Sequence, residues 1–316
     1  MLDVLKSMSG GPWNWLVGWM FPSLIACSAT GFLLIPRHPR IPLPKDAGDR
    51  TLLLIGISLL VALLLSSLGT ILYRVLEGYA VLPKWIGSKW SAGQLRRRNA
   101  LREQIEQANP HSNAASIPGA SINIALTAGR LARYPAADGE VGPTRLGNAI
   151  RAFETYGYDR YQLDSLSLWS ELTCLVPDAL RQEEMNAKAP IDFFVSLVWL
   201  APCYAVLAAA SLVEAGFDGW VSGSVVLALV AVPVCYRLAV VASDRWASSV
   251  RAIVNVGRLP LAERLGFDVP RSIVSERRLW QAISWFVTEN YDESYSRDLT
   301  PFRKRVTAPG QPSRPK

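Results

Sequence analysis

The side chains best suited to chemistry lie in one stretch, RLGNAIRAFETYGYDRYQLD, which runs from Arg145 to Asp164. Its guanidinium groups could bind phosphate, and its carboxylates could act as a general base or as oxygen ligands of a metal ion. The alternative interpretation, which the mixture of charges favours, is that these residues form ion pairs and cap helix ends. The candidate functional cluster comprises Arg145, Asn148, Arg151, Glu154, Asp159, Arg160 and Asp164.

No established catalytic motif accompanies this cluster. The sequence contains no P-loop, GxSxG or HExxH pattern, and its only histidines are His38 and His111. No CxxC motif or Cys/His pair occurs among the cysteines, which are Cys27, Cys174, Cys203 and Cys235. We therefore expect no metal site, no cofactor and no disulfide framework, and the sequence identifies no catalytic residue.

The cluster is expected on an amphipathic helix and the turn that follows it. Pro143 and Thr144 are start signals for a helix, and Gly157 is predicted to end it. Asp164 or Ser165 is predicted to cap the next helix. The apolar face of the first helix recurs at helical spacing and comprises Leu146, Ala149, Ile150 and Phe153.

Four long apolar runs dominate the rest of the chain. Crossing the hydrocarbon core of a bilayer takes about 20 apolar residues in a helix, and each run reaches that length. The first run has only Lys6 before it and begins with a cluster of tryptophans, so we expect a retained anchor and not a cleaved signal peptide. The sequence thus predicts an all-α polytopic membrane protein with spans at about 13–35, 51–73, 191–213 and 219–241.

Charge predicts the orientation of these spans. The short loop EAGFD between the last two spans holds no Lys or Arg, whereas the segments on their other side are rich in both, so the loop should face outward. Both termini are then cytoplasmic. The first loop opposes this topology with Arg37, Arg40, Lys45 and Arg50, but a larger basic set follows the second span. The net charge of +7 indicates anionic lipid at the cytoplasmic face as a partner, and no nucleic acid.

The domain prediction follows from the spans. Residues 78–190 and 243–297 are expected to pack into one cytoplasmic helical domain, in which Ser91 caps a helix over 92–107 and another helix covers 275–291. A break is predicted at Gly257 and Pro260. The expected segments are a transmembrane hairpin at 1–77, a helical region at 78–190, a second hairpin at 191–242, C-terminal helices at 243–297 and a disordered basic tail at 298–316.

The spans carry no charged residue near their centres, which argues against a secondary transporter, and Asp192 lies at the start of the third. Small residues recur every four positions in the last two spans. We interpret them as packing positions within that hairpin, with oligomerisation as the alternative. The helix-packing residues are Ala201, Ala205, Ala209, Gly219 and Gly223.

Two segments carry a resemblance. YRVLEGY at the end of the second span and PTRLGNAIRAFETYGYDRYQLDSLSLWSEL from Pro143 to Leu172 resemble a loose group of bacterial multi-span inner-membrane proteins. That group has a similar Leu-Gly-Asn helix, a Tyr-Gly-type turn and a following Asp, and VPRSIVSERRLW resembles it more loosely. The resemblance implies a bacterial inner membrane location and identifies no catalytic residue.

These features lead to three hypotheses about function. The leading one is a non-enzymatic membrane protein whose cytoplasmic helical domain senses or docks something and is coupled to the spans, as an oligomer or an oligomeric pore. The second is a membrane enzyme acting on a lipid or a lipid-linked phosphate, with the carboxylates of the cluster as base or metal ligands. The third is a scaffold subunit that binds another membrane protein.

Overall fold

The computed structural model describes residues 11–38, 44, 46–78, 83–108, 120–289 and 293–304. These residues form helices and connecting turns. The one β contact among them is an isolated antiparallel bridge between Phe267 and Arg303. The all-helical class predicted from the sequence is therefore confirmed for the described residues.

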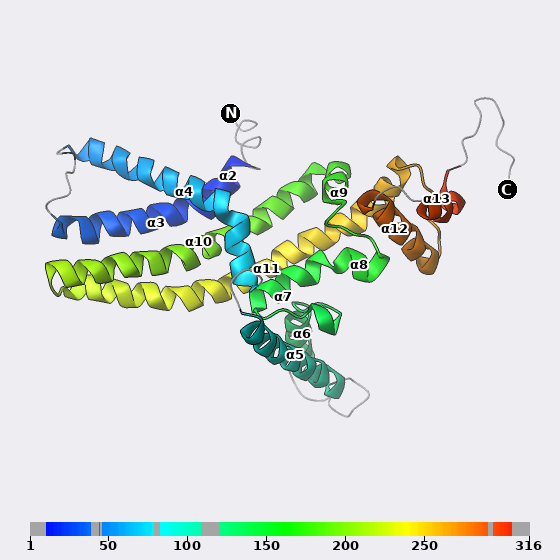
Figure 1. The fold of residues 1–316 in the computed structure, drawn as a ribbon, viewed down its shortest axis with the longest axis horizontal. Coiled ribbons are helices and arrows are strands. Elements are labelled where there is room, and N and C mark those ends of the chain that lie inside the picture. The colour runs from blue at the N-terminus through cyan, green and yellow to red at the C-terminus, as the bar shows by residue number, and fades with distance from the viewer. Residues whose placement is uncertain are drawn as a thin grey trace. The chain divides into compact units, whose positions relative to one another are not determined.

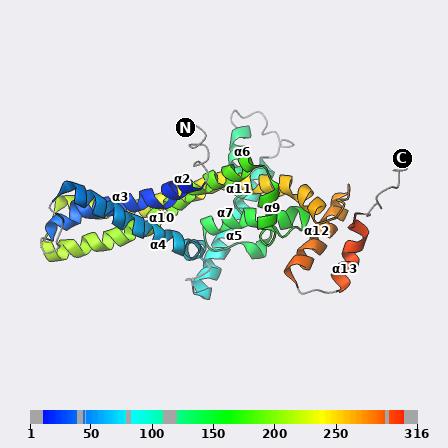
Figure 2. The same ribbon diagram turned by 90° about the horizontal axis from the view of Figure 1, so that it is seen from above.

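Among the described residues, four helices are long and apolar enough to cross a membrane, as predicted. The first span is a composite of Pro12–Arg37, and it contains two π-helical segments, η1 (Leu16–Met20) and η2 (Thr30–Leu34), around α3 (Phe21–Ala29). The others are α4 (Ala47–Glu77), α10 (Asp178–Ala215) and α11 (Gly219–Arg264). Figures 1 and 2 show α3 beside α4, and the apolar part of α10 beside that of α11.

Both α10 and α11 are longer than the sequence patterns indicated. The helix beginning at Asp178 continues through Pro190 and Pro202 without a break. The break predicted at Gly257 and Pro260 is wrong, because α11 continues to Arg264. The absent side chain of Gly257 instead permits close packing, since a Cβ there would lie 3.1 Å from Leu172 Cδ2 and from Val176 Cγ1.

The remaining helices are shorter and more polar. They are α2 (Pro12–Trp15, the start of the first span), α5 (Lys84–Gln107), α6 (Ala120–Leu131), α7 (Arg145–Glu154), α8 (Tyr156–Tyr161), α9 (Trp169–Leu175), α12 (Ile273–Thr288) and α13 (Glu293–Leu299), with 3₁₀ turns at Ile35–Arg37, Asp138–Glu140 and Thr300–Phe302. The capping prediction for Ser91 is wrong. Helix α5 starts earlier because Pro83 precedes it in an extended conformation and its carbonyl accepts the first backbone hydrogen bonds of the helix.

The prediction that Gly157 ends α7 is also wrong. Helix α7 ends at Glu154, and Gly157 is buried inside α8. A Cβ at this position would lie 2.8 Å from Leu163 O and 2.9 Å from Ser165 Oγ, so glycine is needed there for close approach of the following turn. The left-handed residue that closes α8 is Gln162, with φ of 60°.

The chain divides into two compact units. One unit comprises Met1–Ala152 and Gln182–Ser248, and it contains the apolar parts of the four spans together with α5 and α6. The other comprises Phe153–Arg181 and Ser249–Lys316. The two polar regions predicted to form a single helical domain are thus distributed over both units.

The second unit has its own hydrophobic core. Trp280, Leu279, Ile283, Leu172 and Ile253 are all fully buried in it. Burial of such large apolar side chains is the main stabilising contribution to a helical unit of this kind, at about 25 cal/mol per Å² removed from water.

The start predicted for the disordered tail, residue 298, lies too early in the chain. Leu299 is buried in the core of the second unit and Phe302 packs against it. The backbone N–H of Asp268 donates to Phe302 O at 2.8 Å, and that of Lys304 donates to Gly266 O at 2.9 Å. The chain is therefore ordered to Lys304, because apolar side chains at 299 and 302 anchor it, and the rest of the predicted tail lies outside the described residues.

Small residues pack the second hairpin only in part. Ala205 is buried, and Ala201 packs against the same cluster as Tyr204 and Ala208. Ala209, Gly219 and Gly223 are exposed, and a Cβ at either glycine would meet nothing within 4 Å. Within this chain Ala201 and Ala205 thus pack in the hairpin, and the buried face of α10 continues through Ala208 and not Ala209. A role of the small residues in oligomerisation stays a prediction.

Candidate functional site

The candidate site of the first unit lies where the segment from Arg133 to Asn148 meets the ends of two spans. We call it the span-end junction. Thr144 Oγ1 donates to the carbonyl of Glu77 at the end of α4 (3.1 Å), and the backbone N–H of Leu146 donates to Tyr236 Oη on α11 (3.2 Å). Arg133 donates to both carboxylate oxygens of Asp244, also on α11, at 2.7 and 2.6 Å. One segment therefore contacts two spans.

Helix α7 begins directly against the end of α4. Thr144 Oγ1 also accepts from the backbone N–H of Gly147 at 3.0 Å, so Thr144 is the N-cap, as the sequence predicted. A Cβ at Gly147 would lie 2.7 Å from Glu77 O and 3.0 Å from Glu77 Cα. Glycine is thus required by the close approach of two backbones, and not by its conformational freedom.

Asn148 has a structural role in this junction. Its side chain is buried, its Oδ1 accepts from the backbone N–H of Gly142 at 2.6 Å, and its Nδ2 donates to Gly142 O at 3.1 Å. Both ends of the amide are therefore used to fix the turn that precedes α7. A buried amide satisfied in this way holds a local conformation and has little capacity left for a ligand.

Arg98 is a second buried support, which the sequence pattern did not indicate. Its side chain is fully buried on α5, Nη1 donates to Pro135 O at 3.0 Å, and Nη2 forms an ion pair with Asp138. Arg98 is the last of three consecutive arginines, so composition alone does not distinguish it. The available signal is its spacing from buried Leu101, three residues later on the same helix face.

A basic group surrounds Tyr134 at the junction. Burial raises the pKa of the Tyr134 hydroxyl, and the nearby guanidinium groups of Arg97, Arg145 and Arg133 oppose this change. Arg133 is committed to Asp244, whereas Arg97 and Arg145 are exposed. Arg145 of the predicted cluster therefore belongs to a basic surface beside the span ends.

The seven residues of the predicted cluster divide between the two units. Arg145, Asn148 and Arg151 belong to the first unit, and Glu154, Asp159, Arg160 and Asp164 belong to the second. The structure groups no three or more His, Cys, Asp or Glu side chains around a potential metal position in the part of the chain that it describes.

In the second unit the cluster residues stabilise turns. Asp164 Oδ1 accepts from the backbone N–H groups of Leu166 and Ser167, each at 3.1 Å, in the turn before α9. Arg277 Nη1 donates to the main-chain carbonyls of Asp159 and Arg160, each at 2.7 Å. The prediction that Asp164 or Ser165 caps the next helix is wrong, because α9 begins only at Trp169 and its N-cap, Leu168, makes no side-chain capping hydrogen bond. The use of Asp159 and Arg160 through their backbone has no signature in the sequence.

The tyrosines of this stretch are fixed to the end of α11. Tyr156 and Tyr161 both donate their hydroxyl hydrogens to Asn255 Oδ1, at 3.1 and 2.9 Å. The guanidinium carbon of Arg258 lies 4.4 Å from the centroid of the Tyr161 ring, and Arg258 Nε donates to Glu276 Oε1 at 2.9 Å. Burial raises the pKa of Tyr161. These contacts use the aromatic groups for packing and orientation.

A buried polar contact joins three spans of the first unit. Tyr73 Oη donates to Asp192 Oδ1 at 2.7 Å, and Ser196 Oγ donates to Gly18 O at 2.9 Å. Gly18 lies in the π-helical segment η1, and a Cβ there would be 2.8 Å from Asp192 Cβ. The sequence located Asp192 at the start of its span but gave no indication of its partners.

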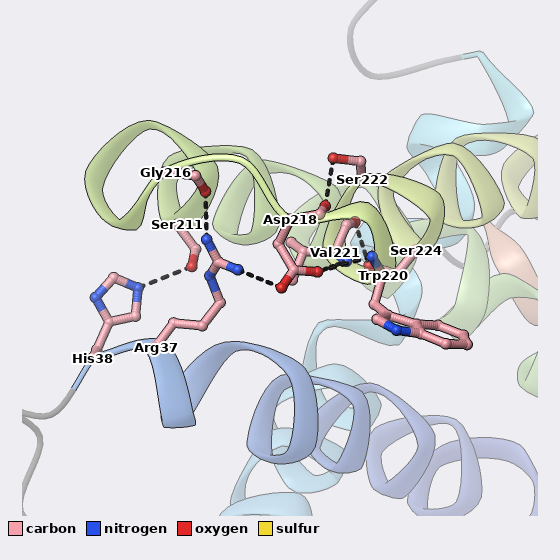
Figure 3. A network of polar contacts seen from close by, with 9 residues as sticks. All are labelled: Arg37, His38, Ser211, Gly216, Asp218, Trp220, Val221, Ser222 and Ser224. Carbon is pink, nitrogen blue, oxygen red and sulfur yellow. Dashed lines mark hydrogen bonds and ion pairs between the residues drawn. The ribbon is translucent and has the colours of Figure 1, made fainter.

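A further polar network joins the loop ends of the two hairpins (Figure 3). Arg37 forms an ion pair with Asp218 at 2.8 Å and also donates to Gly216 O, while His38 Nε2 lies 3.0 Å from Ser211 Oγ. Asp218 Oδ1 also accepts from the first N–H groups of α11. The hydrogen bond from the backbone N–H of Val221 is the main reason that the pKa of Asp218 is lowered.

Comparison with known proteins adds nothing to this geometry, because no family model, curated protein or solved structure matches the chain. The class of protein therefore follows from the fold itself. The part of the chain that the structure describes is all-helical, with four helices that can cross a membrane and a polar helical segment fixed to the ends of two of them.

Proposed function

We propose that the protein is a non-enzymatic integral membrane protein of the bacterial inner membrane. Its helical segment on the cytoplasmic side binds a partner or a signal, and the span-end junction transmits that event to the spans. The segment belongs to the same compact unit as the spans and is not joined to them by a loose linker alone, which supports this function.

The observation that carries the proposal is the pair of contacts made by the segment around α7. Thr144 and Gly147 contact the end of α4, and Leu146 and Arg133 contact α11. Any event that shifts this segment must break or move contacts to both spans together. Coupling of this kind needs a contiguous set of packed and hydrogen-bonded groups, and the junction supplies one.

The exposed arginines indicate what the segment would contact. Arg97 and Arg145 lie beside the span ends, where anionic lipid head groups or an acidic protein surface would be attracted to them. We assign the partner role to an acidic protein surface. Anionic lipid head groups would contact every basic residue at this depth of the membrane, so we do not treat them as the specific partner.

Site-specific photo-crosslinking in intact cells tests the docking function. Benzoylphenylalanine replaces Arg97 or Arg145 in separate variants, and exposed Leu227 on α11 serves as the lipid-facing control. We expect a discrete protein adduct of defined mass at Arg97 or Arg145 and none at Leu227. If irradiation yields no protein adduct in any of the three variants, the docking function is contradicted.

A conservative change at the junction separates sensing from a purely passive scaffold. Tyr236→Phe removes the hydroxyl group that accepts the Leu146 N–H but keeps the ring. If the junction transmits partner binding to the spans, amide hydrogen exchange at the end of α4 should change when the partner binds to the wild type. The change should be much smaller in Tyr236→Phe. Equal responses in both proteins would favour the scaffold.

The oligomeric pore is one form of this proposal and has its own measurement. Purified full-length protein is reconstituted into planar bilayers and recorded over a range of voltages, with and without the crosslinked partner. Discrete conductance steps support the pore, and silent bilayers under all conditions restrict the function to docking and sensing.

A further inference from the structure

A cavity of about 670 Å³ lies among the first span, α4 and α10 of the first unit. Ligand sites for small molecules usually have volumes of about 300–1,000 Å³, so this cavity is large enough for a specific occupant. Its wall includes the π-helical segment η2 through Thr30, Gly31 and Phe32. Single π-helical turns are rare and often occur at functional sites.

The wall of the cavity is suited to hydrocarbon. The hydroxyl groups of Thr30 and Thr51 each donate to a main-chain carbonyl one turn earlier in their own helix, at 2.9 and 3.0 Å. The hydroxyl of Tyr204 lies 2.7 Å from that of Ser224. Each hydroxyl already has a partner and the other lining side chains are mostly apolar, so a polar ligand would lose its hydration without replacement.

A cation, Arg50, lies at the loop end of this cavity. Arg50 is the charged residue among those that line it, its side chain is exposed, and its Nε donates to Pro44 O at 2.6 Å. Arg37, which follows the lining residue Pro36, is committed to Asp218. Arg50 therefore supplies the guanidinium that can pair with an anion, for which its planar set of donors is well suited.

We propose that this cavity binds one acyl chain of an anionic phospholipid, whose phosphate group pairs with Arg50. An apolar wall with the cation of Arg50 at its end matches an amphiphile that carries a negative head group. The site lies at the loop end of the bundle and involves no residue of the span-end junction. It therefore stands or fails independently of the proposed function.

The cysteines of the chain provide the measurement. Cys27 and Cys203 line the cavity, whereas Cys174 is exposed and does not line it. Maleimide labelling rates of the full-length protein in detergent are followed by peptide mass spectrometry while lipid is titrated. The additions are palmitoyl-oleoyl phosphatidylglycerol, palmitoyl-oleoyl phosphatidylcholine, or sodium phosphate alone.

We expect phosphatidylglycerol to slow labelling of Cys27 and Cys203 and to leave Cys174 unchanged. Phosphatidylcholine should require a concentration higher by about fivefold for the same protection, which is the effect of one surface cation on an anionic lipid. Sodium phosphate alone should protect neither thiol. Protection of either thiol by sodium phosphate alone would overturn the acyl-chain site. So would a result in which neither lipid protects Cys27 or Cys203.

Matched variants test the two parts of the site. Arg50→Gln should remove the preference for phosphatidylglycerol, while Arg74→Gln should keep it, since exposed Arg74 lies at the other end of the same helix. Cys203→Trp should block lipid protection of Cys27, while Trp at exposed Ala210 on the same helix should not. Equal preference in Arg50→Gln and wild type would overturn the role of Arg50.

Discussion

At the scale of single residues, the glycine at position 147 has the clearest energetic role. We predict that Gly147→Ala destabilises the first unit by about 1–3 kcal/mol, the usual cost of overpacking, because the new Cβ would lie 2.7 Å from Glu77 O. Thermal unfolding of the purified protein in detergent measures this loss. The control is Gly129→Ala in α6, where a Cβ meets nothing within 4 Å. Equal midpoints for both variants would contradict the contact.

Asp218 gives a prediction about pH. Its folded pKa is lowered, first by the Val221 N–H, so its contribution to stability is present above the unfolded value of about 3.9 and is lost as pH falls through the folded value. The difference in unfolding midpoint between wild type and Asp218→Asn should therefore be constant from about pH 5 to 8 and shrink below about pH 4. A difference that grows on acidification would show that the sign is wrong. The same series on Asp49→Asn, an exposed residue in the first turn of α4, provides the comparison.

At the scale of elements, α11 contains a proline whose helix-breaking tendency is outweighed by the packing of the helix. Pro260 lies inside the helix, where proline lacks the N–H of the helical hydrogen bond and costs about 3 kcal/mol. We predict that Pro260→Ala raises the stability of the second unit by about 1–3 kcal/mol, since the backbone bond can then form. Leu259→Ala, an exposed neighbour, should have a small effect. Limited proteolysis and hydrogen exchange over residues 249–289 measure both variants, and faster exchange in Pro260→Ala would refute the prediction.

Pro260 also shows which parts of the fold the sequence could predict. Apolar length alone identified the four spans, because the bilayer thickness fixes the number of residues required. Gly257 and Pro260 were read as local breakers, but Leu261 and Ala262 are fully buried beside them and keep the helix intact. Propensity is a weak signal that tertiary packing overrides.

The candidate site was less predictable for a related reason. The N-cap role of Thr144 and the turn role of Asp164 are local, so short sequence patterns could identify them. The burial of Arg98 and the pairing of Tyr73 with Asp192 depend on residues 37 and 119 positions away in the chain. No pattern within a window of one helix can specify such partners.

At the scale of the whole molecule, the predicted orientation in the membrane determines which thiols are accessible from outside the cell. We predict that a cysteine introduced as Pro42→Cys reacts with a membrane-impermeant maleimide in intact cells, whereas native Cys174, which is exposed, reacts only after permeabilisation. The variant carries Cys203→Ser to remove the exposed thiol of the third span. Labelling of Pro42→Cys only after lysis would invert the topology and place the basic group of Arg97 and Arg145 outside.

The π-helical segments of the first span bear on how its length can change. A π turn holds an additional residue compared with an α turn, and η1 and η2 each contain such a turn. Deleting one residue within η2 can convert it to α-helix and leave both flanks in register. The same deletion in the α-helical α4 would rotate every later residue by about 100° and turn its buried face toward lipid. The first span is therefore the one in which single-residue deletions should be tolerated, and a deletion scan of both helices would display that asymmetry.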